Sequence, residues 1–264
     1  MELDFRALLA EERKKAVLKS SDTRSVEVKE IKHDRDKVNR DATGYLRDAS
    51  SKAFEFLHID NLDAYKLRCD YESIFYIPNY IDAATEEAIL SCVDKSPWTL
   101  LKTRRLQHHC SLQQPLPDYL QVINDSIVSS GIFSAVNQPN HVLINDYRSN
   151  EGILHHVDGP SYYPKVAILS MLSHCLMTFR PNLTSAKIGE ASQDEIFSVY
   201  LEPRSLLVFD QEIYTHLQHG IHADTEECVL NSRIPCLNNS ISSVTRGVRR
   251  TSLTIRKMYS EGEM

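Results

Sequence analysis

From His141 onward the chain is a succession of short runs of β-branched and other apolar residues separated by turns, and this feature constrains its fold most. About eight such runs follow one another: HVLINDY, GILHHVD, KVAILSML, CLMTFRP, IFSVYLEP, SLLVFDQE, HGIHA and TSLTIRKM. Short strands at such close spacing are typical of antiparallel sandwiches and barrels. We therefore predict a mainly β domain with a jelly-roll core.

A strand and two helices are predicted ahead of this β-rich part. The stretch SIFYIPNYI, residues 73–81, is rich in β-formers. Asp82 follows as a helix cap, and Ile89 and Val93 belong to an apolar stripe at helical spacing. The stretch LPDYLQVINDSIVSSGIF, residues 116–133, indicates a second helix. We expect these flanking helices to cover one sheet of the core.

Residues 1–70 differ in composition from the rest of the chain. They hold 15 of the 30 Lys and Arg residues and 15 of the 36 Asp and Glu residues, with too little apolar content in the middle to bury. We predict a charged, partly disordered and partly helical N-terminal extension, either a solvated tail or a segment that binds a protein partner. Its stretch DATGYLRDASSKAFEFLHID, residues 41–60, could alternatively be a small helix that docks on the domain. The domain itself is predicted to span residues 71–264.

Composition also restricts the compartment and the partners. No apolar run approaches the roughly 20 residues of a membrane span, and the N-terminus alternates acids and bases where a signal peptide would be apolar. The six cysteines form no CxxC pair, which favours free thiols in a reducing compartment. We expect a cytoplasmic or nuclear protein without a membrane association. The net charge of −6 does not indicate a nucleic-acid binder by itself.

The motif HVD supplies two metal-ligand types on one face of a strand. His156 and Asp158 are two residues apart and share a face, whereas His155 does not share the face of Asp158. A third ligand would come from a distant strand, and His219 in LQHGI fits best, with His216 and His222 as rivals. Two histidines and one carboxylate form the facial triad of non-haem Fe(II) oxygenases, although zinc hydrolases use a similar set.

Two further alternating stretches point to an anion. In RTSLTIR, Arg250, Ser252 and Arg256 share one face, while the intervening Leu253 and Ile255 also look buried. Buried arginines need an anionic partner, and a dicarboxylate such as 2-oxoglutarate would supply one. A solvent-facing basic edge strand is the alternative.

A second polar pair lies ahead of the HVD motif. Asn145 and Tyr147 are again two residues apart and offer polar groups for the same anion.

The motifs NDY, HVD, HGI and RTSLTIR, in this order, resemble the AlkB family of Fe(II)/2-oxoglutarate-dependent dioxygenases. The stretches FYIPNYI, RRLQ, NHVLINDY, EPRSLLVF and LQHGI are most similar to the branch of the sixth AlkB homologue. The resemblance covers roughly residues 73–258. It implies a double-stranded β-helix core, Fe(II) and 2-oxoglutarate as cofactors and O₂ as co-substrate. It also implies oxidative demethylation, in which an N-methyl group is hydroxylated and lost as formaldehyde while 2-oxoglutarate becomes succinate and CO₂.

Carried over by position, the resemblance assigns the metal and cofactor sites. Iron would be bound by His156, Asp158 and His219. The distal carboxylate of 2-oxoglutarate would be bound by Arg250 with Tyr147. Its metal-chelating end would lie near Asn145, Ser252 and Arg256.

The substrate is predicted less sharply. The stretch WTLLKTRRLQHHC, residues 98–110, lies where the family covers a nucleobase, and its basic and aromatic residues suit a nucleic acid. A loop that packs Trp98 into the core is the alternative. The candidate substrate residues are Trp98, Arg104, Arg105, Tyr162 and Tyr163. We expect a methylated RNA or DNA. A protein or peptide demethylase or hydroxylase, or a catalytically silent binding protein of the same fold, would be the alternatives.

Overall fold

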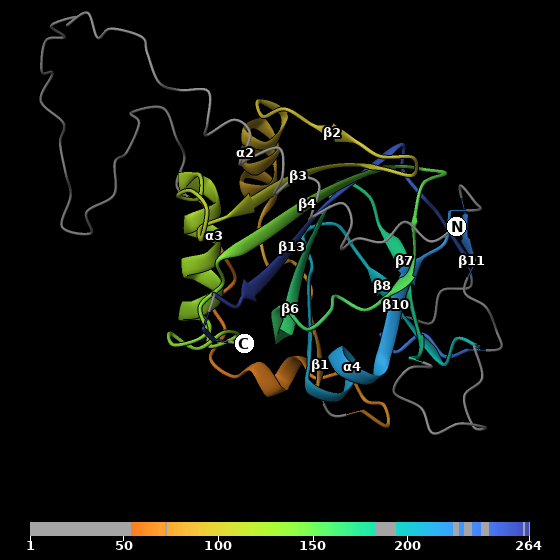
Figure 1. Cartoon of the computed structure of the whole chain (residues 1–264). Coiled ribbons are helices and arrows are strands. Elements are labelled where there is room, and N and C mark those ends of the chain that lie inside the picture. Colours follow the sequence, from red (N-terminus) through yellow and green to blue (C-terminus); the bar gives the residue numbers. More distant parts are fainter. Residues whose placement is uncertain are drawn as a thin grey trace, which may run out of the picture. The chain divides into compact units, whose positions relative to one another are not determined.

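The computed structural model describes residues 54–71, 73–182, 194–223, 227–229, 234–238, 243–260 and 262–263. All of them belong to one compact unit, Lys52–Met264 (Figure 1). The extension predicted for residues 1–70 therefore lies largely outside the described residues. The prediction that this extension binds a protein partner falls outside them as well. No helix in the described part of the chain is long and apolar enough to cross a membrane.

The larger sheet has seven antiparallel strands with β13 near its centre. β13 pairs with β4 on one side and with β6 on the other. In order across the sheet the strands are β1 (Ile74–Ile77), β9 (Leu206–Asp210), β6 (Tyr162–Met171), β13 (Arg249–Met258), β4 (His141–Arg148), β3 (Arg105–Cys110) and β2 (Thr99–Leu100). The stretch read from the sequence as a covering segment is thus the β2–β3 edge of this sheet.

The smaller sheet has four antiparallel strands and packs against the larger one. Its order is β5 (Ile153–His156), β10 (Leu217–Ile221), β7 (Cys175–Pro181) and β8 (Phe197–Leu201). Side chains from both sheets, such as Phe179 and Phe209, form one buried apolar cluster between them. A short helix, α4 (Gln211–His216), carries the chain from β9 in one sheet to β10 in the other, and β11 (Glu227–Val229) pairs with β12 (Ser243–Thr245). The predicted jelly-roll core is confirmed.

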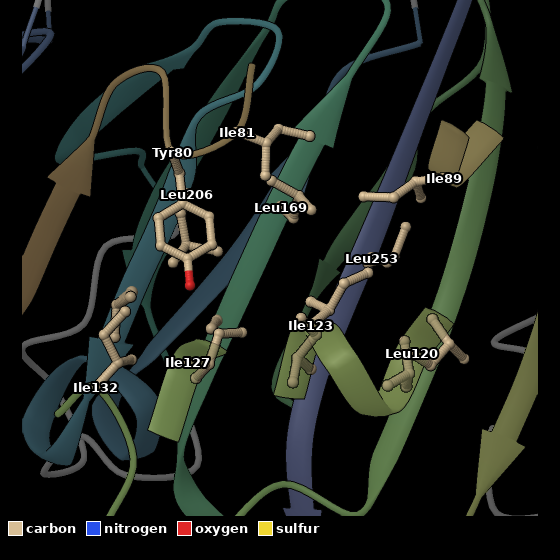
Figure 2. Packing of buried hydrophobic residues seen from close by; sticks show 14 of the residues in the cluster. Tyr80, Ile81, Ile89, Leu120, Ile123, Ile127, Ile132, Leu169, Leu206 and Leu253 are labelled. Carbon is tan, nitrogen blue, oxygen red and sulfur yellow. The ribbon is translucent and has the colours of Figure 1, made fainter. Parts of the chain in front are cut away.

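Two helices cover the other face of the larger sheet, as predicted. α2 (Ala83–Asp94) begins at Asp82, whose side chain accepts a hydrogen bond from the Thr85 amide at 2.7 Å. α3 (Asp118–Ser129) lays Ile123 and neighbouring apolar side chains onto the strands (Figure 2). Leu253 of β13 lies in this helix-side cluster. Because side chains alternate along a strand, the residues on either side of Leu253 must face the smaller sheet.

The folded unit begins earlier than the sequence indicates. Phe54 and Phe56 pack on the helix-side cluster, and the Phe56 ring lies 5.7 Å from that of Tyr80. A 3-10 helix, η1 (Leu62–Tyr65), follows and contacts β1. Residues 54–70 therefore belong to the domain rather than to the extension, because their aromatic side chains have an apolar surface to bury against.

Candidate metal centre

Three side chains from two paired strands converge between the sheets. His156 ends β5, Asp158 follows two residues later, and His219 lies on β10 directly opposite His156 in the β5–β10 register. One ligand atom from each residue lies within 4.8 Å of the other two. The rival histidines are placed elsewhere. His216 is exposed on α4, and His222 bonds to Glu195.

His156 and Asp158 each keep one atom open for a metal, and His219 is held by aromatic packing. His156 donates from Nδ1 to the Leu154 carbonyl at 2.8 Å, so its Nε2 carries the free lone pair. Asp158 accepts from Arg256 through Oδ1 at 2.5 Å, while its buried Oδ2 has no partner among the described residues. The ring of His219 packs against those of Phe209 and Phe179, at 5.1 and 6.2 Å.

The protonation states also suit a metal, which binds neutral imidazole and ionised carboxylate. Burial lowers the pKa of His156, and it lowers the pKa of His219 to about 3. For Asp158, burial raises the pKa, but the opposing charge of Arg256 leaves it below its usual value. All three groups are thus in their metal-binding form near neutral pH.

Arg250 is a buried cation without a carboxylate partner in the described part of the chain. Arg250 is 2% exposed, and its one hydrogen bond to another described side chain runs from Nη2 to the Ser170 hydroxyl at 2.9 Å. Its Nε and NH1 have no partner among the described residues. Burial raises the pKa of the neighbouring Tyr147, so this phenol stays protonated and can donate. A buried guanidinium with open donors fits an anionic ligand.

The remaining cofactor candidates lie on the same face. Ser252 and Asn145 are directly opposite each other in the β13–β4 register, and both are buried. Asn145 accepts a hydrogen bond through Oδ1 from Arg104 Nε at 2.9 Å. Arg256 keeps Nε and NH2 unpaired within the described ranges after NH1 has bound Asp158. The structure therefore places the predicted 2-oxoglutarate residues on the face of the larger sheet from which Arg256 reaches Asp158 of the metal group.

The candidate substrate residues are divided between the two faces. Arg104 and Tyr162 lie on the metal side, and the Tyr162 ring lies 4.3 Å from the Arg256 guanidinium carbon. Arg105 covers the Trp98 ring at 4.3 Å and bonds to Asp146, on the helix side. Tyr163 also packs on the helix-side cluster. The structure does not bring Trp98, Arg105 or Tyr163 to the triad. Strand alternation turns Arg105 and Tyr163 to the helix side, and Trp98 packs on the cluster there.

Sequence reasoning missed a buried histidine next to Arg256. His141 is 1% exposed, its ring lies 5.1 Å from that of Tyr162, and its Nε2 lies 2.8 Å from His108 Nε2. Burial lowers the pKa of His141 well below its usual value, so it is neutral beside Arg256. The signal was available, since His141 is four residues before Asn145 on the same strand and must share its face.

The chain is similar to several known proteins. A family model described as "2OG-Fe(II) oxygenase superfamily" matches residues 102–256. The "Probable RNA/DNA demethylase ALKBH6" of Danio rerio is 32% identical over 212 residues, covering 74% of this chain and 90% of that protein. The "Alkylated DNA repair protein ALKBH8 homolog" of Arabidopsis thaliana is 26% identical, covering 70% of this chain and 58% of that protein. A solved structure titled "The structure of OsALKBH1" is 14% identical with a TM-score of 0.48, covering 72% and 99%.

Proposed function

The chain belongs to the 2OG-Fe(II) oxygenase superfamily, and on that basis we propose that it removes an N-alkyl group oxidatively from a nucleic acid. The observation that carries the proposal is a His-Asp-His group beside two buried arginines whose donors remain open in the described part of the chain. Neither feature is explained by packing alone, because unpartnered buried charges destabilise a fold.

The His-Asp-His group fits iron. His156, Asp158 and His219 would occupy one face of an octahedron and leave three positions for other ligands. Arg256 donates to one oxygen of Asp158 and keeps the carboxylate ionised, so that the other oxygen would be available to a metal. When bound, Fe(II) and 2-oxoglutarate supply the oxidation of a C–H bond by O₂, with succinate and CO₂ as products.

The buried arginines fit a dicarboxylate. Arg250 would bind the distal carboxylate through the open donors of its guanidinium group, with the protonated Tyr147 beside it. Asn145, Ser252 and Arg256 would hold the other end, next to the triad. This arrangement would orient the cofactor before substrate arrives, and the aromatic rings around His219 would keep water away.

A nucleic acid is the first-choice substrate because the Danio rerio relative is named a probable RNA/DNA demethylase. The net charge of −6 favours a second candidate, a basic peptide carrying N-methyl groups. The two candidate substrates need opposite charges on the protein surface. The phosphates of a nucleic acid require nearby cations, whereas a basic peptide requires nearby carboxylates.

Succinate and formaldehyde release test the proposal. Purified protein with Fe(II), ascorbate and O₂ should form succinate slowly alone and faster with an N-methylated RNA or DNA. His219→Ala provides the matched control for metal-independent background. Stimulation by methylated peptides alone would support the second candidate instead. Absence of succinate formation, with and without substrates, would indicate a binding protein that keeps the fold.

A further inference from the structure

Two adjacent arginines each donate a hydrogen bond from Nε to a side chain of β4, on opposite faces of the larger sheet. Arg105 Nε donates to Asp146 Oδ1 at 3.0 Å on the helix side. Arg104 Nε donates to Asn145 Oδ1 at 2.9 Å on the metal side. The acceptors are themselves neighbours on β4. Only one of the two arginines therefore reaches the face that carries the candidate metal and cofactor residues.

The Arg104 contact determines which way the Asn145 amide faces. An asparagine side chain has one acceptor oxygen and one donor nitrogen. Because Arg104 occupies Oδ1, the amide nitrogen is directed elsewhere, and no group in the described part of the chain accepts from it. Asn145 is 4% exposed as a whole residue, and its amide nitrogen stays open to a ligand. An open donor on this face suits an anionic ligand.

Arg104 also lies close to Tyr147. Burial raises the pKa of Tyr147, and the positive charge of Arg104 lowers it. Arg105 forms an ion pair with Asp146, whereas Arg104 has no carboxylate partner within the described ranges. Its charge thus remains available on the metal side.

We infer that Arg104 is a positioning residue of the 2-oxoglutarate site, holding the Asn145 amide so that its nitrogen faces the metal-chelating end of the cofactor. This inference rests on the proposed function. Arg104 lies just before β3, so it brings a third strand region to a site otherwise built on β4 and β13. In this role Arg104 acts on the cofactor. The sequence had instead suggested Arg104 as a substrate-binding residue.

Binding of 2-oxoglutarate tests the inference without turnover. With Mn(II) in place of Fe(II), calorimetric titration should give a Kd about tenfold weaker for Arg104→Leu than for the unsubstituted protein, the loss typical of one charged hydrogen bond. Arg105→Leu is the matched control, with the Kd expected to change less than twofold. Melting temperatures of both variants separate a local effect from a loss of folding. An equal weakening in Arg105→Leu would overturn the inference.

A conservative variant separates orientation from charge. Gln places its amide nitrogen at the same distance along the side chain as Arg Nε, so Arg104→Gln keeps the donor to Asn145 while removing the charge. We expect it to recover most of the affinity that Arg104→Leu loses. If Arg104→Gln binds as weakly as Arg104→Leu, charge rather than amide orientation is responsible, and the inference fails.

A double-mutant cycle tests whether Arg104 acts through Asn145. The affinity loss in Arg104→Leu/Asn145→Ala should equal that of Asn145→Ala alone. Losses that multiply would mean independent contributions and would overturn the inference. Wild-type protein that fails to bind 2-oxoglutarate would remove the proposed function and this inference together. Normal wild-type binding with an unaffected Arg104→Leu would remove this inference alone.

Discussion

At the scale of single residues, adjacent residues of this chain have different contacts, because successive side chains of a strand lie on opposite faces of the sheet. His156 joins the candidate metal group, while His155 turns away and lies 2.9 Å from Thr178 Oγ1 and 3.3 Å from Glu195 Oε1. The two histidines therefore provide a matched pair for testing the metal site.

His156→Ala should abolish tight Mn(II) binding and substrate-independent succinate formation, because the metal loses one of three protein ligands. His155→Ala should retain both activities and lose about 1–3 kcal/mol of stability, the usual effect of breaking a buried hydrogen-bonded group. Calorimetric Mn(II) titration and denaturant unfolding measure the two effects. Equal Mn(II) affinity in wild type and His156→Ala would contradict the assignment of the triad.

Arg250→Met should weaken 2-oxoglutarate binding by about 3–5 kcal/mol, since the ligand would then bury an unpaired carboxylate. The cofactor-free variant should nevertheless melt no lower than wild type, because Arg250 is buried without a counter-charge in the described part of the chain. Thermal unfolding with and without 2-oxoglutarate measures both effects. A large loss of stability in the cofactor-free variant would indicate a structural role for Arg250 instead.

At the scale of elements, the pairing of β5 with β10 holds two of the metal-ligand candidates opposite each other. This pairing needs a glycine at the start of β5. A Cβ atom on Gly152 would lie 2.2 Å from the Ile221 carbonyl oxygen at the end of β10, closer than any real contact. The backbone of one strand would have to move, and the move would carry His156 away from His219.

Gly152→Ala should therefore cost about 1–3 kcal/mol of stability and also weaken Mn(II) binding. Gly131→Ala is a suitable comparison, because Gly131 has a φ of 71° but open space around its Cβ position. It should cost roughly 1 kcal/mol from backbone strain alone and leave Mn(II) affinity unchanged. Unfolding and metal titration of both variants distinguish the cases. Unaltered Mn(II) affinity in Gly152→Ala would show that the register tolerates the shift.

At the scale of the whole molecule, several buried histidines make stability depend on pH. Burial lowers the pKa of His141 well below 6.5, that of His155 to about 4 and that of His219 to about 3. In the unfolded chain these groups take up protons near pH 6.5, whereas in the folded chain they stay neutral. The stability contributed by each neutral histidine is thus present above pH 6.5. It is lost as the pH falls toward the pKa of that histidine in the folded chain.

The metal-free protein should lose roughly 1.4 kcal/mol per pH unit for each such histidine between about pH 6.5 and 4.5. Carboxylates with lowered pKa values, such as Asp94 and Glu195, act only nearer their usual values of 3.8 and 4.5. Urea unfolding at several pH values measures the slope, which His141→Gln should reduce. A flat profile over this range would contradict the burial of neutral histidines.

Much of the fold was predictable from the sequence because it depends on local patterns. Short alternating runs from His141 onward indicated a jelly roll, and the stripe containing Ile89 indicated a helix against one sheet. Alternation likewise predicted that Arg250 and Ser252 would share a face with Arg256. The sequence left open whether the stretch around Phe54 docks on the domain, since burial of an aromatic ring depends on a distant surface.

The sequence by itself determined the architecture and the residue types that meet an iron and a dicarboxylate, because strand period and ligand chemistry are local properties. Only the tertiary structure decided which strands pair and in what register, and these pairings depend on contacts between residues 41 to 98 positions apart. They place His219 opposite His156 and Arg256 on Asp158. They also turn Arg104 toward Asn145 while sending Arg105 to the other face.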